Sequence, residues 1–189
     1  MPTRAYILIV AALFLVSATA IGEPSSEARA QYKASLILKL LEYVSWEKDG
    51  PAKGEAMVVG IVDDAPLAKK MKELASFSGL DPKPEIREMK AGDDLSDCHV
   101  IYVSASDVAG AEATIAKLGD NKIFTISDAD GLIQSGVMVN FIQESETGVK
   151  EKFEVNLTRV QEESMKISSK FLKLARVYEG TPGNLVLNE

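Results

Sequence analysis

The apolar residues of the chain recur in two alternating patterns, one typical of helices and one typical of buried strands. Residues 27–44 are apolar at spacings of three and four, which predicts an amphipathic helix. Its charged residues fall mostly on the other face, namely Lys33, Lys39 and Glu42. A short run rich in β-branched residues predicts a buried strand at residues 57–62, and further strands are predicted at residues 85–89, 99–103 and 122–126. Between them, helical spacing returns at residues 66–77 and 107–118.

The second half of the chain predicts a hairpin and a long helix. Strands are expected at residues 137–143 and 152–157, joined by the turn-like residues 145–148. Residues 158–177 then return to helical spacing, which allows a break near Met165.

The order of these elements predicts an α/β fold. Strands that alternate with helices favour parallel pairs, and the hairpin makes the sheet mixed. We therefore predict a single domain over residues 27–178, with a mixed, mostly parallel sheet flanked by helices, a C-terminal antiparallel hairpin and a last helix. Residues 179–189 are expected to form a flexible tail.

The first residues have the pattern of a secretory signal peptide. Residues 6–16 are an unbroken apolar run, preceded by Arg4 as the only charge and followed by the small residues Ala18-Thr19-Ala20. The run is too short for a helix across a hydrocarbon core about 30 Å thick, which takes about 20 residues. We predict that residues 1–20 are cleaved off near Ala20 and that the protein is exported.

Composition and charge exclude several classes of protein. A net charge of −7 lacks the basic excess that binding to nucleic acid requires. No second apolar stretch is long enough for a membrane span, so we expect no direct span after cleavage of the leader. The lone Cys98 cannot form an internal disulfide.

The sequence contains none of the common nucleotide-binding or hydrolase motifs. Gly60 lies inside a predicted strand, and Asp63-Asp64 occupies the turn where a nucleotide-binding fold needs glycines. With one histidine, a catalytic triad would have to use His99, which lies in an apolar stretch. We therefore predict that the protein is not an enzyme and needs no cofactor or metal.

Cys98 and His99 are neighbours, which suggests a metal or thiol site at first. Neighbours on a strand point to opposite faces, so the pair cannot readily chelate one ion or act as nucleophile and base. We interpret them as a small buried sulfur and an edge-facing imidazole. The alternative is an exposed, oxidisable thiol that pairs between chains.

Aspartates follow two of the predicted strands. The stretch Asp128-x-Asp130-Gly131 resembles the start of a calcium loop, but its twelfth position is Val139, so turn or helix capping is favoured. Asp63 and Asp64 end a buried strand, where α/β sheets bind ligands and where acids also cap the next helix. Both interpretations stay open, with Asp63, Asp64 and Asp128 as candidate ligand-binding residues.

Partner contacts are expected near the first helix and the last one. Trp46, the only tryptophan, follows the first helix and is either a core anchor or a contact residue. A basic stripe along the last predicted helix is either a solvated face or a docking face for an acidic partner, and consists of Lys166, Lys170, Lys173 and Arg176. Our candidate partner-binding residues are Trp46, Glu47, Lys170 and Lys173.

Several blocks of the sequence resemble the YfiR family of periplasmic proteins, in the family's order. These blocks are residues 33–46, 98–104, 123–128, 153–157 and 166–176. The resemblance implies a compact periplasmic α/β domain, often dimeric, without catalytic activity. In the member that gives the family its name, the protein represses a membrane-bound diguanylate cyclase by holding its periplasmic sensor domain. Release of that partner raises cyclic di-GMP and promotes biofilm formation.

The chain departs from the family pattern in two ways. That member has paired cysteines whose disulfides report redox state, whereas Cys98 alone excludes intramolecular redox switching here. Where the family commonly has Gly-Gly-Met-Ile-Asn-Phe, residues 135–141 keep only Gly136 and Asn140-Phe141, so the turn entering that strand differs.

Two functions follow from the sequence. The first is a periplasmic regulator that binds and represses the sensor domain of an inner-membrane signalling enzyme, with a homodimer as a candidate state. The alternative is a periplasmic sensor or carrier of a small ligand.

Overall fold

The structure is a computed structural model that describes residues 25–119, 121–144 and 150–188. The predicted signal peptide and the predicted turn at 145–148 lie outside these residues. Among the described residues, no helix has both the length and the apolar character needed to cross a membrane.

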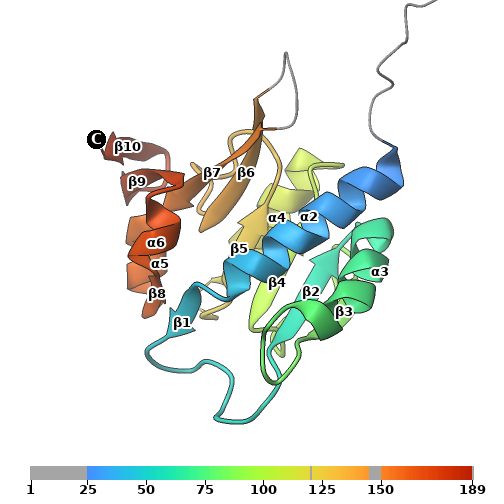
Figure 1. The fold of residues 1–189 in the computed structure, drawn as a ribbon. Helices are drawn as coiled ribbons and strands as arrows, with labels where there is room; N and C mark the ends of the chain where they lie inside the picture. The colour runs from blue at the N-terminus through green and yellow to red at the C-terminus, as the bar shows by residue number, and fades with distance from the viewer. Residues whose placement is uncertain (1–24, 120, 145–149, 189) are drawn as a thin grey trace, which may run out of the picture.

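A mixed sheet forms the centre of the molecule (Figure 1). Within the described residues it has eight strands, in the spatial order β10 (Asn184–Asn188), β9 (Ala175–Thr181), β7 (Lys150–Asn156), β6 (Val139–Glu144), β5 (Phe124–Ser127), β4 (Val100–Val103), β2 (Val58–Val62) and β3 (Glu85–Met89). The neighbours from β3 to β6 are parallel, as are β7 and β9. The pairs β6–β7 and β9–β10 are antiparallel. The predicted α/β class and the mixed, mostly parallel sheet are confirmed.

Helices cover both faces of the sheet. Helices α2 (Ser26–Leu41) and α3 (Ala65–Leu74) pack on one face, and the 3-10 turn η1 (Ala75–Phe77) follows α3. Helix α4 (Val108–Leu118) packs on the opposite face, behind the sheet in Figure 1. Because strands β2 and β4 are buried on both faces, their sequences are continuous apolar runs rather than alternating ones.

The side chains of these central strands belong to two separate hydrophobic clusters. Val59, Ile61 and Tyr102 face α2 and α3. Val62 and Ile101 face α4 instead. This alternation follows from the two-residue period of a strand and fixes which side chains can reach each face.

The predicted helix over 158–177 is wrong. The segment forms α5 (Leu157–Glu162), β8 (Met165–Ile167), α6 (Ser169–Leu172) and the start of β9. Helix α5 ends because Ser164 is in the left-handed region at φ 57°, and α6 begins where the Ser168 hydroxyl accepts a hydrogen bond from the Lys170 N–H. Strand β8 pairs with β1 (Val44–Trp46), so the first helix also ends earlier than expected.

The chain ends in a hairpin where the sequence suggested a tail. Strands β9 and β10 pair in register around Thr181-Pro182-Gly183-Asn184. Gly183 has a φ of 76°, the conformation that the third residue of a type II turn requires after proline. Strand β10 is thereby one edge of the sheet, and β3 is the other.

Candidate functional site

The site predicted for ligands lies at the carboxyl ends of the parallel strands. From β2 the chain crosses through α3 to β3 on one side, and from β4 it crosses through α4 to β5 on the other. The connections therefore diverge between β2 and β4, which is where open α/β sheets usually bind ligands. Asp63-Asp64 follows β2, and Asp128 follows β5.

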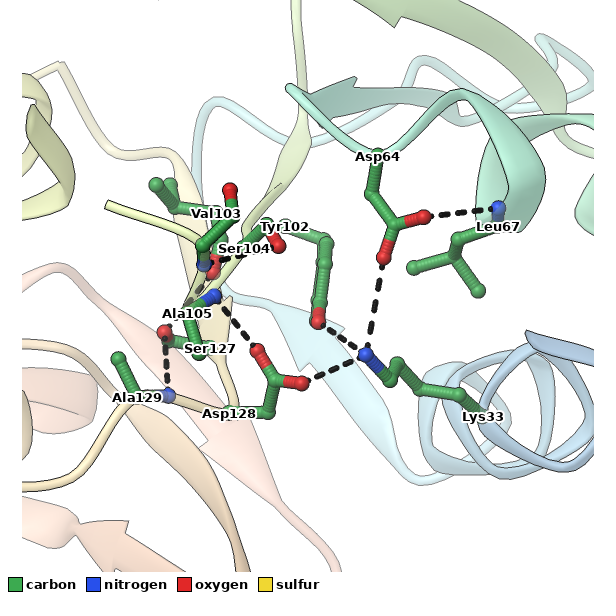
Figure 2. Close-up of polar contacts among 11 residues, drawn as sticks. Lys33, Asp64, Leu67, Tyr102, Val103, Ser104, Ala105, Ser127, Asp128 and Ala129 are labelled. Carbon is green, nitrogen blue, oxygen red and sulfur yellow. Dashed lines mark hydrogen bonds and ion pairs between the residues drawn. The ribbon is translucent and has the colours of Figure 1, made fainter. Parts of the chain in front are cut away.

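A lysine from α2 occupies the space above these strand ends (Figure 2). The Lys33 ammonium lies 2.6 Å from the Asp128 carboxylate, 2.9 Å from the Tyr102 hydroxyl and 3.6 Å from Asp64. It also lies 5.3 Å from the centre of the Tyr102 ring. Since the lysine and the two aspartates are only about one-fifth exposed, their ion pairs are weakly screened. Lys33 thus joins α2 to the ends of β2, β4 and β5.

The backbone also engages the predicted ligand aspartates. The second oxygen of Asp64 accepts a hydrogen bond from the Leu67 N–H and caps α3, as one of the two sequence interpretations expected. The second oxygen of Asp128 accepts from the Ala105 N–H, which holds the loop after β4. These aspartates therefore use both oxygens within the protein.

Asp63 is turned away from this cluster. Its backbone is left-handed at φ 55°, and its carboxylate accepts a hydrogen bond from the Ala91 N–H after β3. A cavity of about 20 Å³ lies between Asp63, Ser104 and Asp107, which is space for a single water. The structure thus brings together Asp64 and Asp128 but not Asp63. Ligand binding by the three aspartates stays a prediction.

Sequence reasoning missed Lys33 and assigned it to the polar face of the helix. The structure shows its side chain 18% exposed, so that assignment is wrong. Lys33 is three residues after Ala30 and four before Ile37, both of which are buried. The helical spacing itself therefore placed this lysine on the buried stripe, where a charge requires an acidic partner.

Cys98 and His99 lie directly before β4, which begins at Val100, and their side chains have different surroundings. Cys98 is 5% exposed, and burial raises the pKa of its thiol, so the favoured interpretation of a buried sulfur fits the structure. The Nδ1 atom of His99 accepts a hydrogen bond from the Val58 N–H at 3.1 Å. Burial lowers the pKa of this imidazole, and the contact at Nδ1 fixes the neutral form with its proton on Nε2.

Trp46 is partly buried and packs against the hydrophobic core. Its ring lies edge-on to Phe124, with centroids 6.4 Å apart. The chain turns back over the indole at Gly50, where a Cβ atom would lie 2.5 Å from the Trp46 Cβ. These contacts make Trp46 an anchor for β1 and the loop that follows it.

The remaining partner-binding candidates are Glu47, which directly follows β1, Lys170 in α6, and Lys173 at the end of α6. Glu47 forms an ion pair with Lys166 across the two strands, and this contact lowers the pKa of Glu47. Lys170 and Lys173 project from α6 and form no ion pair with any residue that the structure describes. The basic stripe is therefore spread over β8, α6 and β9 rather than along one helix.

An exposed leucine follows Lys173 in the chain, close to the two lysines that have no ion pair among the described residues. Leu174 is 67% exposed and lies three and four residues beyond Phe171 and Lys170. Phe171 is buried and packs 4.9 Å from the Phe153 ring, so α6 is fixed to the core by its other side. We call Lys170, Lys173 and Leu174 the α6 face.

Comparisons with solved structures find proteins of similar fold. A crystal structure of a conserved domain protein from Vibrio cholerae is similar, with a TM-score of 0.54, 13% identity, and coverage of 80% of this chain and 60% of that one. The ABC domain of Streptococcus pneumoniae in complex with L-Trp has a TM-score of 0.51, 14% identity, and coverage of 78% and 59%. At such identities the likeness shows the fold alone, and the chain spans about 60% of the length of these two proteins. No curated protein matches the sequence significantly.

The fold and the site define an α/β protein in which a lysine of its own occupies the usual ligand crevice of the sheet. Residues 30–176 match the family model described as YfiR/HmsC-like. The chain therefore belongs to the YfiR/HmsC-like family, a regulatory, non-enzymatic family of the periplasm with a role in cyclic di-GMP signalling.

Proposed function

We propose that this protein binds the periplasmic sensor domain of an inner-membrane diguanylate cyclase and holds the cyclase inactive. Membership in the YfiR/HmsC-like family supports the general role. The α6 face supports the choice of a binding surface, and it is the observation on which the proposal rests.

The α6 face has the chemistry of a protein contact. Leu174 exposes two-thirds of its surface next to two ammonium groups that have no carboxylate partner among the described residues. An apolar side chain at the centre of a contact, with charges at its rim, is the usual arrangement of a protein interface. The expected partner surface is acidic around an apolar pocket, because opposite charges speed association and fix register.

The α6 face is also held rigidly. Phe171 packs against Phe153 on one side, and its ring centroid lies 6.0 Å from that of Tyr43. A rigid surface loses little conformational entropy on binding, which favours affinity. Trp46 is the last residue of β1, which pairs with β8, and Glu47 follows it directly; both stay candidate contacts beside the α6 face.

A binding experiment tests the proposal directly. The tagged chain is used to capture proteins from detergent-solubilised membranes, and we expect it to retain a protein with a periplasmic domain and a diguanylate cyclase domain. The double variant Lys170→Glu/Lys173→Glu should weaken this binding by at least about tenfold, since it reverses both charges. In cells we expect both this variant and deletion of the gene to raise cyclic di-GMP.

A matched variant controls for net charge. Lys83→Glu/Lys90→Glu reverses two exposed lysines that flank β3, at the opposite edge of the sheet from α6. This variant should bind as the wild type does. Retention of no cyclase, or equal effects of the two double variants, would contradict the proposal.

A further inference from the structure

The two edges of the sheet differ in chemistry. Edge strand β3 carries the charged residues Glu85, Arg87 and Glu88. Edge strand β10 carries no charge, and its Val186 and Leu187 are 66% and 45% exposed. Charges along an edge oppose pairing with another strand, whereas an uncharged apolar edge favours it. Strand β10 is therefore the edge on which another strand can add.

The hydrogen bonds of β10 show which backbone groups face outward. The Leu185 N–H points away from β9 and donates to the Gln134 Oε1 atom at 3.2 Å. Its opposite residue, Gly180, likewise donates its N–H to the Thr158 hydroxyl rather than to β10. Because the direction alternates along an antiparallel strand, the N–H and C=O of Leu187 face outward as well.

The sequence of β10 is symmetric. Asn184-Leu185-Val186-Leu187-Asn188 reads the same in both directions. In an antiparallel pair of two such strands centred on Val186, leucine lies opposite leucine and asparagine opposite asparagine. Leu185 then lies opposite Leu187 of the second copy, so the residues with outward-facing groups meet each other. Such a contact uses the same patch on both molecules, as a two-fold dimer requires.

We propose that β10 pairs antiparallel with β10 of a second copy of this chain, around a two-fold axis at Val186. The pairing joins the two sheets into one. The Leu185 N–H exchanges the Gln134 side chain for the carbonyl of Leu187 in the second copy. The family match ends at residue 176, so this surface lies outside the matched region. The proposal concerns the purified chain alone and does not rest on the binding of a cyclase.

The two-fold axis at Val186 gives a charge-swap test. Sedimentation of the chain should give about twice the monomer mass at high concentration. Val186→Lys and Val186→Glu each bring like charges together on the axis, so the dissociation constant of the dimer should rise by about tenfold or more in each variant. An equimolar mixture of the two variants should dimerise again, because lysine then lies opposite glutamate. Phe77→Lys introduces the same charge at an exposed apolar residue on η1 and should leave the dimer unchanged.

Each outcome decides the proposal. A wild-type chain that stays monomeric at its solubility limit overturns it. A dimer that resists both variants at Val186 forms through another surface and overturns it as well, and so does a mixture that stays monomeric. Urea unfolding of each variant shows whether the monomer is intact, and the mixture then distinguishes loss of pairing from loss of folding.

Discussion

Lys33 and Asp128, 95 residues apart in the sequence, form an ion pair of 2.6 Å between α2 and the end of β5. The same ammonium lies 3.6 Å from Asp64 after β2. One side chain thus links the first helix of the domain to strands on both sides of the point where the chain connections diverge.

Replacement of Lys33 by methionine should destabilise the fold. Lys33→Met keeps the length of the side chain but leaves two partly buried carboxylates close together without a cation. We expect a loss of about 1–2 kcal/mol in the free energy of unfolding, measured with urea. Lys39→Met is the matched control on the same helix, because its ion pair with Glu42 is exposed, and it should cost far less. Equal losses in the two variants would show that the Lys33 cluster adds no stability.

A double-mutant cycle measures the Lys33–Asp128 pair itself. Asp128→Asn removes the charge but keeps an oxygen that can accept from the Ala105 N–H. The effects of Lys33→Met and Asp128→Asn should fall short of additivity by about 1 kcal/mol, since each variant already removes the pair. Strict additivity would mean that the two groups do not interact in solution.

The only histidine should make stability depend on pH in a narrow window. Burial lowers the pKa of His99 in the folded chain below 6.5, and its Nδ1 atom accepts the Val58 N–H. As the pH falls below about 6.5 the unfolded chain therefore takes up a proton first, so stability is lost until the pH passes the folded pKa. Above pH 6.5 the contribution of the neutral His99 to the free energy of unfolding is complete. Unfolding free energies between pH 8 and pH 5 should fall more steeply for the wild type than for His99→Gln, and parallel curves would contradict this account.

The thiol of Cys98 should react slowly in the native protein. It is 5% exposed, and burial raises its pKa, so little thiolate forms at neutral pH. Labelling with a disulfide reagent should be at least about 100-fold slower in buffer than in denaturant, as expected for a thiol that reacts only after opening. Rapid labelling of the native chain would favour the alternative of an exposed, oxidisable thiol.

Gly180 should be required for the β9–β10 hairpin. Its φ is 128°, and a Cβ atom there would lie 2.6 Å from the Asn184 carbonyl oxygen. Gly180→Ala should therefore destabilise β10 by about 1–3 kcal/mol, seen as faster hydrogen exchange of its amides. Gly92→Ala is the control, because Gly92 also has a positive φ but has open space around it. Similar exchange at β10 in both variants would contradict the prediction.

The central strands could be predicted because their burial is visible in the sequence. Strands β2 and β4 are apolar along their whole length, as strands covered on both faces must be. The acids after β2 and β5 were also placed correctly at the carboxyl ends of strands. Their partner Lys33 was not, because its charge was given more weight than its spacing from Ala30 and Ile37.

The secondary structure after β7 could not be predicted from the spacing of apolar residues alone. Val160, Ile167 and Phe171 have the spacing of one face of a single long helix, yet they belong to α5, β8 and α6. The deciding feature is the left-handed Ser164, a conformation that serine adopts without a signal in the sequence. The last hairpin did carry a signal, since Pro182-Gly183 is a common turn pair.

The contrast between the two edges of the sheet also limits how far copies of this chain can assemble. A two-fold contact at β10 buries the uncharged edge of both molecules. The two outer edges of the joined sheet are then copies of β3, each with Glu85, Arg87 and Glu88. Growth by further strand addition would have to begin on these charged edges. The assembly therefore closes at two copies and cannot polymerise into a fibre by the same contact.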